Sequence, residues 1–164
     1  MSAELILDRW LHVVAGITWI GLLYYFNLVQ TPGLAAAKAD GSAAGITRHI
    51  APRALLWFRW AAVVTWLSGA AYLLRAANLS LTDAFLLQGA SALIGVGAWL
   101  GTIMLFNVWV LIWPNQKKVL GIVLADDAAK ARAGRVAFLA SRTNLMLSIP
   151  MAFFMVAGPH GLPV

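Results

Sequence analysis

Hydrophobic and charged residues are segregated along this chain, because four long apolar stretches alternate with short segments that hold most of the charges. The stretches run from Trp10 to Gln30, Ala54 to Leu74, Ala84 to Trp113 and Val136 to Ala157. A helix rises about 1.5 Å per residue and a hydrocarbon core is about 30 Å thick, so each stretch is long enough to cross a bilayer. Since backbone polar groups in lipid must be satisfied within their own segment, each stretch is predicted to be a helix.

The pattern therefore predicts an all-α fold, an integral membrane bundle of four transmembrane helices that forms a single domain over residues 1–164. Composition agrees, because 62% of the residues are hydrophobic, 11% are charged and the mean hydropathy is +0.81. A soluble domain of this size does not tolerate so apolar a surface. Pro114 is expected to end the third helix, and alanine-rich segments around Ala35 and Ala128 are expected to form short surface helices.

Basic residues gather in the first and third connections between the stretches, which must lie on the same side of the membrane. These connections hold eight of the twelve lysines and arginines, namely Lys38, Arg48, Arg53, Lys117, Lys118, Lys130, Arg132 and Arg135. By the positive-inside rule, both termini face the outer, periplasmic side of a bacterial inner membrane that the chain crosses several times. The net charge of +6 therefore indicates a membrane topology and argues against a nucleic-acid partner.

The histidines are the candidate ligands, since the absence of cysteine leaves only non-covalent haem among the common haem attachments. His12 and His160 are predicted at the outer rim and His49 in an inner loop, so only His12 and His160 can share an iron as an axial pair of haem b. Arg9 and Arg75 are then expected to meet the haem propionates. The alternative is that a histidine near a helix end bonds to water, to lipid headgroups or to a backbone carbonyl.

Two arginines, Arg59 and Arg142, lie inside predicted spans without an obvious partner. Their side chains are long enough to reach the inner interface, and the alternative is that they contact an anionic lipid, a quinone headgroup or a neighbouring subunit. No carboxylate lies inside the four stretches, so nothing supports a proton relay or a cation pathway built on aspartate or glutamate. No catalytic residue is predicted.

Four segments carry a family resemblance, and the two most specific are Gly101–Trp109 and Trp113-Pro-Asn-Gln-Lys-Lys118. The other two are Arg9–Gly21 and Ala51–Trp60. Together they resemble the N-terminal membrane domain of bacterial cytochrome-c-linked urate hydroxylases and the short stand-alone membrane proteins related to it. The family's Ser-Arg-His-Asn looks like Ser141-Arg-Thr-Asn144 here, with Thr143 in place of a histidine, and its closing Asn-His-Tyr-Pro looks like Pro159-His-Gly-Leu162.

The resemblance implies a redox-linked membrane module, because the full-length relatives append a c-type cytochrome that accepts electrons. Here the cytochrome is expected to be a separate partner, and urate oxidation by this polypeptide alone is not expected. The opening Leu11-His-Val13 followed by an aromatic helix also resembles, more loosely, the four-helix haem-binding protoporphyrinogen oxidases.

Three hypotheses remain open. The first, which we favour, is a membrane subunit that binds haem b and passes electrons to a cytochrome partner. The second is a non-catalytic accessory subunit that packs against other membrane subunits of a respiratory or photosynthetic complex, which the small-residue helix faces and many aromatic residues would suit. The third is a free-standing oxidase of a small heterocycle or porphyrin, for which His12 and His160 are the available general bases.

Overall fold

The computed structural model describes the chain from Ser2 to His160, with side chains up to Ala157. These residues form helices and no strand, and they contain four helical runs long and apolar enough to cross a membrane: Ala3–Ala39, Ala43–Arg75, Gly89–Val119 and Asp127–Ala157. The predicted all-α membrane fold of four spanning helices is confirmed. The side of the membrane on which the termini lie stays a prediction.

Three of the runs contain a π-helical segment and therefore consist of several elements. The first run is built from α1 (Ala3–Tyr24), a π-helical segment (Tyr25–Gln30) and α2 (Thr31–Ala39). The second is built from α3 (Ala43–Gly45), a π-helical segment (Ile46–Ile50) and α4 (Ala51–Arg75). The third run begins with a 3-10 turn (Gly89–Ser91) and continues through α6 (Ala92–Phe106), a π-helical segment (Asn107–Ile112) and α7 (Trp113–Val119). The fourth is α8 (Asp127–His160).

Each π-helical segment is followed by an α-helix whose second residue is a proline, namely Pro32, Pro52 and Pro114. Proline has no N–H to donate, and in a regular α-helix its ring clashes with the carbonyl four residues earlier. The wider π turn before the proline changes the local hydrogen-bond register, so the helix continues. The expectation that Pro114 ends the third helix is therefore wrong, because the run extends to Val119.

The third span also begins later than predicted. Ala84 belongs to a separate short helix, α5 (Leu81–Leu86), which ends at Leu87 with a left-handed φ of 56°. Gly95 of α6 allows α5 to fold against the start of the span, since a Cβ at Gly95 would overlap the carbonyl oxygen of Ala84. The hydrophobicity of α5 is thus used for packing on α6 and not for crossing the membrane.

The alanine-rich segments extend the spanning helices and do not form separate surface helices. Ala35 lies in α2, which continues the first run, and Ala128 lies in the first turn of α8. Alanine and lysine are strong helix formers, so these runs persist beyond the length that the membrane requires.

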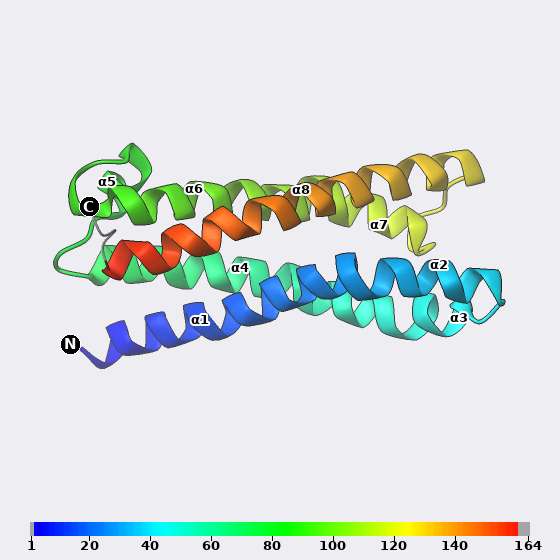
Figure 1. Ribbon diagram of the computed structural model, residues 1–164, viewed down its shortest axis with the longest axis horizontal. Helices are drawn as coiled ribbons and strands as arrows, with labels where there is room; N and C mark the ends of the chain where they lie inside the picture. The colour runs from blue at the N-terminus through cyan, green and yellow to red at the C-terminus, as the bar shows by residue number, and fades with distance from the viewer. Residues whose placement is uncertain (1, 161–164) are drawn as a thin grey trace.

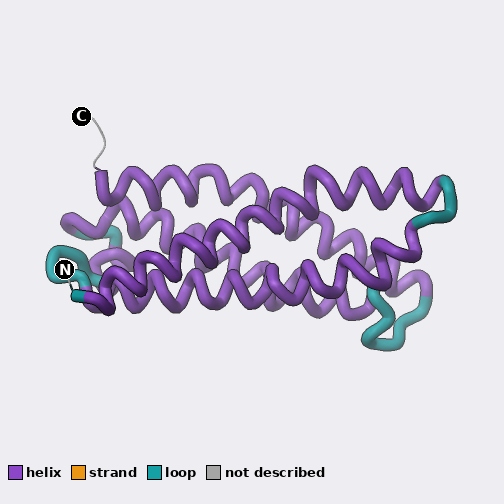
Figure 2. Tube along the Cα trace, turned by 90° about the horizontal axis from the view of Figure 1, so that it is seen from below, coloured by secondary structure: helices purple, strands orange, loops and turns teal. Residues whose placement is uncertain are grey.

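The helices pack as two pairs, α1 against α4 and α6 against α8 (Figures 1 and 2). Contacts between the pairs, α1 with α8 and α4 with α6, are fewer. The pairs meet around a core that includes Trp19, Leu23, Phe58, Met104 and Val108, all almost fully buried. The start of α1, helix α5 and the end of α8 lie at one end of the bundle, and α2, α3 and α7 lie at the other (Figure 1).

Buried amides add hydrogen bonds across the helices in the middle of the bundle. Asn107 Nδ2 donates to Asn144 Oδ1 at 2.8 Å, and Asn144 Nδ2 donates to the carbonyl oxygen of Met104 at 3.0 Å. Asn27 Nδ2 donates to Ser141 Oγ at 2.8 Å. These bonds join the first and third runs to α8, as expected of polar groups between membrane helices.

Candidate functional site

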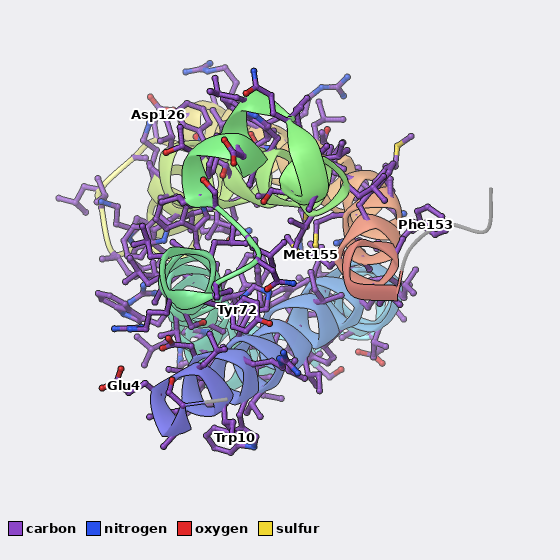
Figure 3. The ribbon with its side chains drawn as sticks, turned by 90° about the vertical axis from the view of Figure 1, so that its left-hand side faces the viewer. Glu4, Trp10, Tyr72, Asp126, Phe153 and Met155 are labelled. Carbon is purple, nitrogen blue, oxygen red and sulfur yellow. The ribbon has the colours of Figure 1, made fainter. Side chains whose placement is uncertain are left out.

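A cavity of about 630 Å³ lies between the two helix pairs near the end of the bundle that holds the start of α1. Its walls come from α1, α4, α5, α6 and α8, and Figure 3 looks along the bundle from this end. The walls are mainly apolar, with a few polar groups supplied by Arg9, His12, Thr65 and Tyr72. A mostly apolar cavity of this size with few polar groups is typical of small-molecule and cofactor sites.

His12, on α1, is half-buried and lines this cavity. Its Nδ1 lies 2.7 Å from the backbone carbonyl oxygen of Thr65 on α4. A carbonyl only accepts hydrogen bonds, so Nδ1 carries the proton and, in the neutral ring, Nε2 keeps its lone pair. Nε2 has no hydrogen bond to any described residue. A metal-ligating histidine is usually held in this way, with its other ring nitrogen donating to a backbone carbonyl or a carboxylate.

Gly69, one turn after Thr65 on α4, makes room for the His12 ring. A Cβ at this position would lie 2.7 Å from Nδ1 and 2.8 Å from Cε1 of His12, closer than such atoms approach. Sequence reasoning missed both Thr65 and Gly69. The signal that was available is the spacing of small residues four apart on one helix face, which permits another helix to approach closely.

Arg9, one turn before His12, also lines the cavity. Its Nη2 donates to the hydroxyl oxygen of Tyr72 on α4 at 2.6 Å, and its guanidinium carbon lies 5.2 Å from the centre of the Tyr72 ring. Arg9 forms no ion pair with a described residue. An unpaired cation therefore lies beside a mainly apolar cavity.

Arg75, the second predicted propionate partner, is differently placed. It forms ion pairs with Asp8 and with Glu4, whose Oε2 lies 3.9 Å from Arg75 Nε. It is not part of the cavity wall. Its role in cofactor binding stays a prediction, whereas its observed contacts tie the end of α4 to the start of α1.

The other two histidines, His160 and His49, lie outside the cavity wall as the structure describes it. His160 is the last residue of α8, four positions after Val156 of the cavity wall, and its side chain lies outside the described part of the chain. His49 is exposed in the π-helical segment before α4, at the other end of the bundle from His12. The bundle thus separates His49 from the cavity.

Two methionines of α8, Met151 and Met155, complete the wall. Met155 extends from α8 toward the space between the pairs (Figure 3), and Gly97 of α6 accommodates it, because a Cβ there would lie 3.1 Å from the Met155 methyl carbon. Among the described side chains, no group of three His, Asp, Glu or Cys residues converges. The nitrogen and sulfur ligand atoms of this wall belong to one imidazole and two thioethers, and the Tyr72 hydroxyl adds an oxygen.

Arg59 and Arg142 each lie over an aromatic ring. The Arg59 guanidinium carbon is 3.9 Å from the centre of the Trp113 ring, and that of Arg142 is 5.2 Å from the centre of the Phe138 ring. Neither forms an ion pair within the described part of the chain. The predicted lipid or partner contact of both arginines stays a prediction.

The fold and the cavity define a class: a helical membrane protein with a mainly apolar, histidine-lined cavity between two helix pairs. Residues 73–162, more than half of the chain, match the family described as urate oxidase N-terminal, and the chain belongs to this family. The resemblance seen in the sequence is thereby confirmed, although two of its segments, Arg9–Gly21 and Ala51–Trp60, lie outside the matched residues. No curated protein and no solved structure matches the chain.

Proposed function

We propose that this membrane domain binds one haem b non-covalently in the cavity, with His12 as an axial ligand, and that it passes electrons to a cytochrome partner. The observation that carries the proposal is the His12 ring, whose Nδ1 is held 2.7 Å from the Thr65 carbonyl oxygen while Nε2 keeps a lone pair. Family membership supports a relation to urate hydroxylase membrane domains, whose resemblance first suggested a redox role.

The residues around the cavity fit such a group chemically. His12 would supply a nitrogen ligand, the mainly apolar wall suits the porphyrin ring, and Arg9, which has no ion pair with a described residue, can bind a propionate together with the Tyr72 hydroxyl. A haem bound there would supply one-electron redox chemistry. His160, whose side chain lies outside the described part of the chain, would be our candidate for a second ligand of the haem iron, and Met155 would be the competing donor on the same helix.

The test is an absorption spectrum of the purified chain, as isolated and after incubation with haemin, in the oxidised and reduced states. We expect a Soret band and haem b bands that the His12→Ala variant loses. His49→Ala is the matched control, because it removes the same ring from the opposite end of the bundle and should leave the bands unchanged. A chain that takes up no haemin, or a His12→Ala variant with an unaltered spectrum, would contradict the proposal.

A further inference from the structure

Two cations from different helices converge on one indole at the end of the bundle opposite the cavity. The Arg59 guanidinium carbon of α4 lies 3.9 Å from the centre of the Trp113 ring, and Lys117 Nζ of α7 lies 5.9 Å from the same centre. The two cations therefore lie within about 10 Å of each other, which is about one Debye length at 0.1 M salt. Two separate segments of the family resemblance, Ala51–Trp60 and Trp113–Lys118, meet at this point.

No described residue supplies a counter-charge for Arg59 or Lys117. A cation–π contact attracts each cation to the ring but does not neutralise it. The aspartates of the nearby connections have other partners. Asp40 accepts hydrogen bonds from the Ser42 hydroxyl and N–H, Asp126 accepts one from the Ala129 N–H, and Asp127 pairs with Lys130. The positive charge of this pair of cations is therefore available to an anion from outside the chain.

The depth of the pair places that anion at the membrane interface. Arg75 is the last residue of α4, and Arg59 lies about 24 Å before it along the helix, at 1.5 Å per residue. A hydrocarbon core is about 30 Å thick, so Arg59 lies near the inner edge of the core when Arg75 lies at the outer edge. Tryptophan also prefers the headgroup layer. Trp113 and Lys117 thus mark the level at which lipid phosphates occur.

A shallow, open apolar groove of about 410 Å³ lies next to this point, on the side of the middle of the membrane. It lies between α4 and the third run, and its walls are Val63, Trp66, Thr102, Leu105, Phe106 and Trp109. Val63 is one turn beyond Arg59, and Trp109 is one turn from Trp113, so the groove and the cations share the same helix faces. A charged head site leading into an apolar groove matches the two parts of a phospholipid.

We propose that Arg59, Lys117 and Trp113 bind the phosphate of an anionic phospholipid whose acyl chain lies in the groove. Arg59 offers a planar fork of donors suited to phosphate oxygens, and Lys117 adds a second positive charge. Arg142 is not part of this site, because its guanidinium lies over Phe138 with no second cation on that ring. Arg59, Lys117 and Trp113 do not line the cavity around His12, and the groove shares the single residue Trp66 with that cavity.

The experiment measures thermal unfolding of the purified full chain in detergent while dioleoyl phosphatidylglycerol is added. We expect a saturable rise in Tm with this lipid, and little change with dioleoyl phosphatidylcholine or with inorganic phosphate. Arg59→Gln and Lys117→Gln should each weaken the apparent affinity about tenfold. Arg142→Gln is the matched control, because it removes the same charge from another helix. Its apparent affinity for dioleoyl phosphatidylglycerol should lie within about twofold of that of the parent chain.

Two further measurements keep the proposal testable if Arg59→Gln folds poorly. Native mass spectrometry should show phosphatidylglycerol retained by the parent chain and by Arg59→Lys more than by Lys117→Gln. Val63→Phe, which narrows the groove, should weaken the binding of dioleoyl phosphatidylglycerol more than the binding of dihexanoyl phosphatidylglycerol, whose acyl chains are shorter. The proposal fails if phosphatidylcholine stabilises equally, if Arg142→Gln is as impaired as Lys117→Gln, or if inorganic phosphate alone reproduces the shift.

Discussion

Gly69 and His12 occupy one shared space between α4 and α1, since a Cβ on Gly69 would lie 2.7 Å from His12 Nδ1. The same Nδ1 is 2.7 Å from the Thr65 carbonyl oxygen. The ring therefore lies against the backbone of α4 at two successive turns, at Thr65 and at Gly69. The position of the imidazole at the cavity is therefore set by a missing side chain as much as by a hydrogen bond.

Gly69→Ala should displace the His12 ring and weaken the contact between α1 and α4. Overpacking of this kind costs about 1–3 kcal/mol, so we expect a measurable loss of stability in chemical or thermal unfolding. Haemin affinity should fall as well. Gly21→Ala is the control, because a Cβ at Gly21 meets nothing within 4 Å, and helical alanine there should be neutral or slightly stabilising. Equal behaviour of the two variants would contradict this account of Gly69.

Arg9→Gln should lower haemin affinity about tenfold, equivalent to about 1.4 kcal/mol, because it removes the unpaired cation of the cavity wall. Arg75→Gln is the matched comparison at the same end of the bundle. It should leave haemin affinity within about twofold, since Arg75 is engaged by Asp8 and Glu4. Haemin titrations followed by absorption measure both, and a larger loss for Arg75→Gln would assign the propionate contact to Arg75.

His160→Ala and Met155→Leu distinguish the two donors for the second axial position. We expect His160→Ala to shift the oxidised haem from low to high spin in electron paramagnetic resonance, and Met155→Leu to leave the low-spin signal unchanged. The reverse result would assign the position to the Met155 sulfur, which lines the cavity opposite α1. Both variants should still bind haem through His12.

Hydrophobic patterning was sufficient to predict the four spans, because the length of an apolar run depends on the bilayer and not on neighbouring helices. It was insufficient at Pro114 and Ala84. The effect of Pro114 depends on whether the preceding turn becomes π-helical, and Ala84 is apolar because α5 packs on Gly95 of α6. Both outcomes are decided by local hydrogen bonding and by packing, to which hydropathy is insensitive.

The candidate site was predictable only where one residue is informative by itself. His12 is a candidate ligand from its type and position, whereas Thr65 and Gly69 matter only because α1 crosses α4 at their level. The same holds at the other end of the bundle. The sequence identified Arg59 as a candidate, but it did not indicate that Arg59 and Lys117 both contact the Trp113 ring. Relationships between helices require the register of one helix against another, which a single sequence does not contain.

Asn144→Ala should destabilise the bundle by about 1–2 kcal/mol, because the Asn144 side chain is fully buried and bonds both Asn107 and the Met104 carbonyl. Thr143→Ala is the neighbouring control. Thr143 is exposed and bonds only within α8, so this substitution should change the free energy of unfolding by less than about 0.5 kcal/mol. Unfolding of both variants in the same detergent provides the comparison, and equal stability would show that the amide bonds contribute little.

The absence of cysteine allows the orientation of the bundle to be tested with single introduced thiols. Asn78 is exposed at the cavity end, between α4 and α5, and Ser42 is exposed at the opposite end, between α2 and α3. Because the connections near Ser42 carry most of the basic residues, the positive-inside rule places Ser42 in the cytoplasm. A membrane-impermeant maleimide should therefore label Asn78→Cys in intact spheroplasts and Ser42→Cys only after lysis. The opposite labelling would place the cavity on the cytoplasmic side, where a periplasmic cytochrome could not receive its electrons directly.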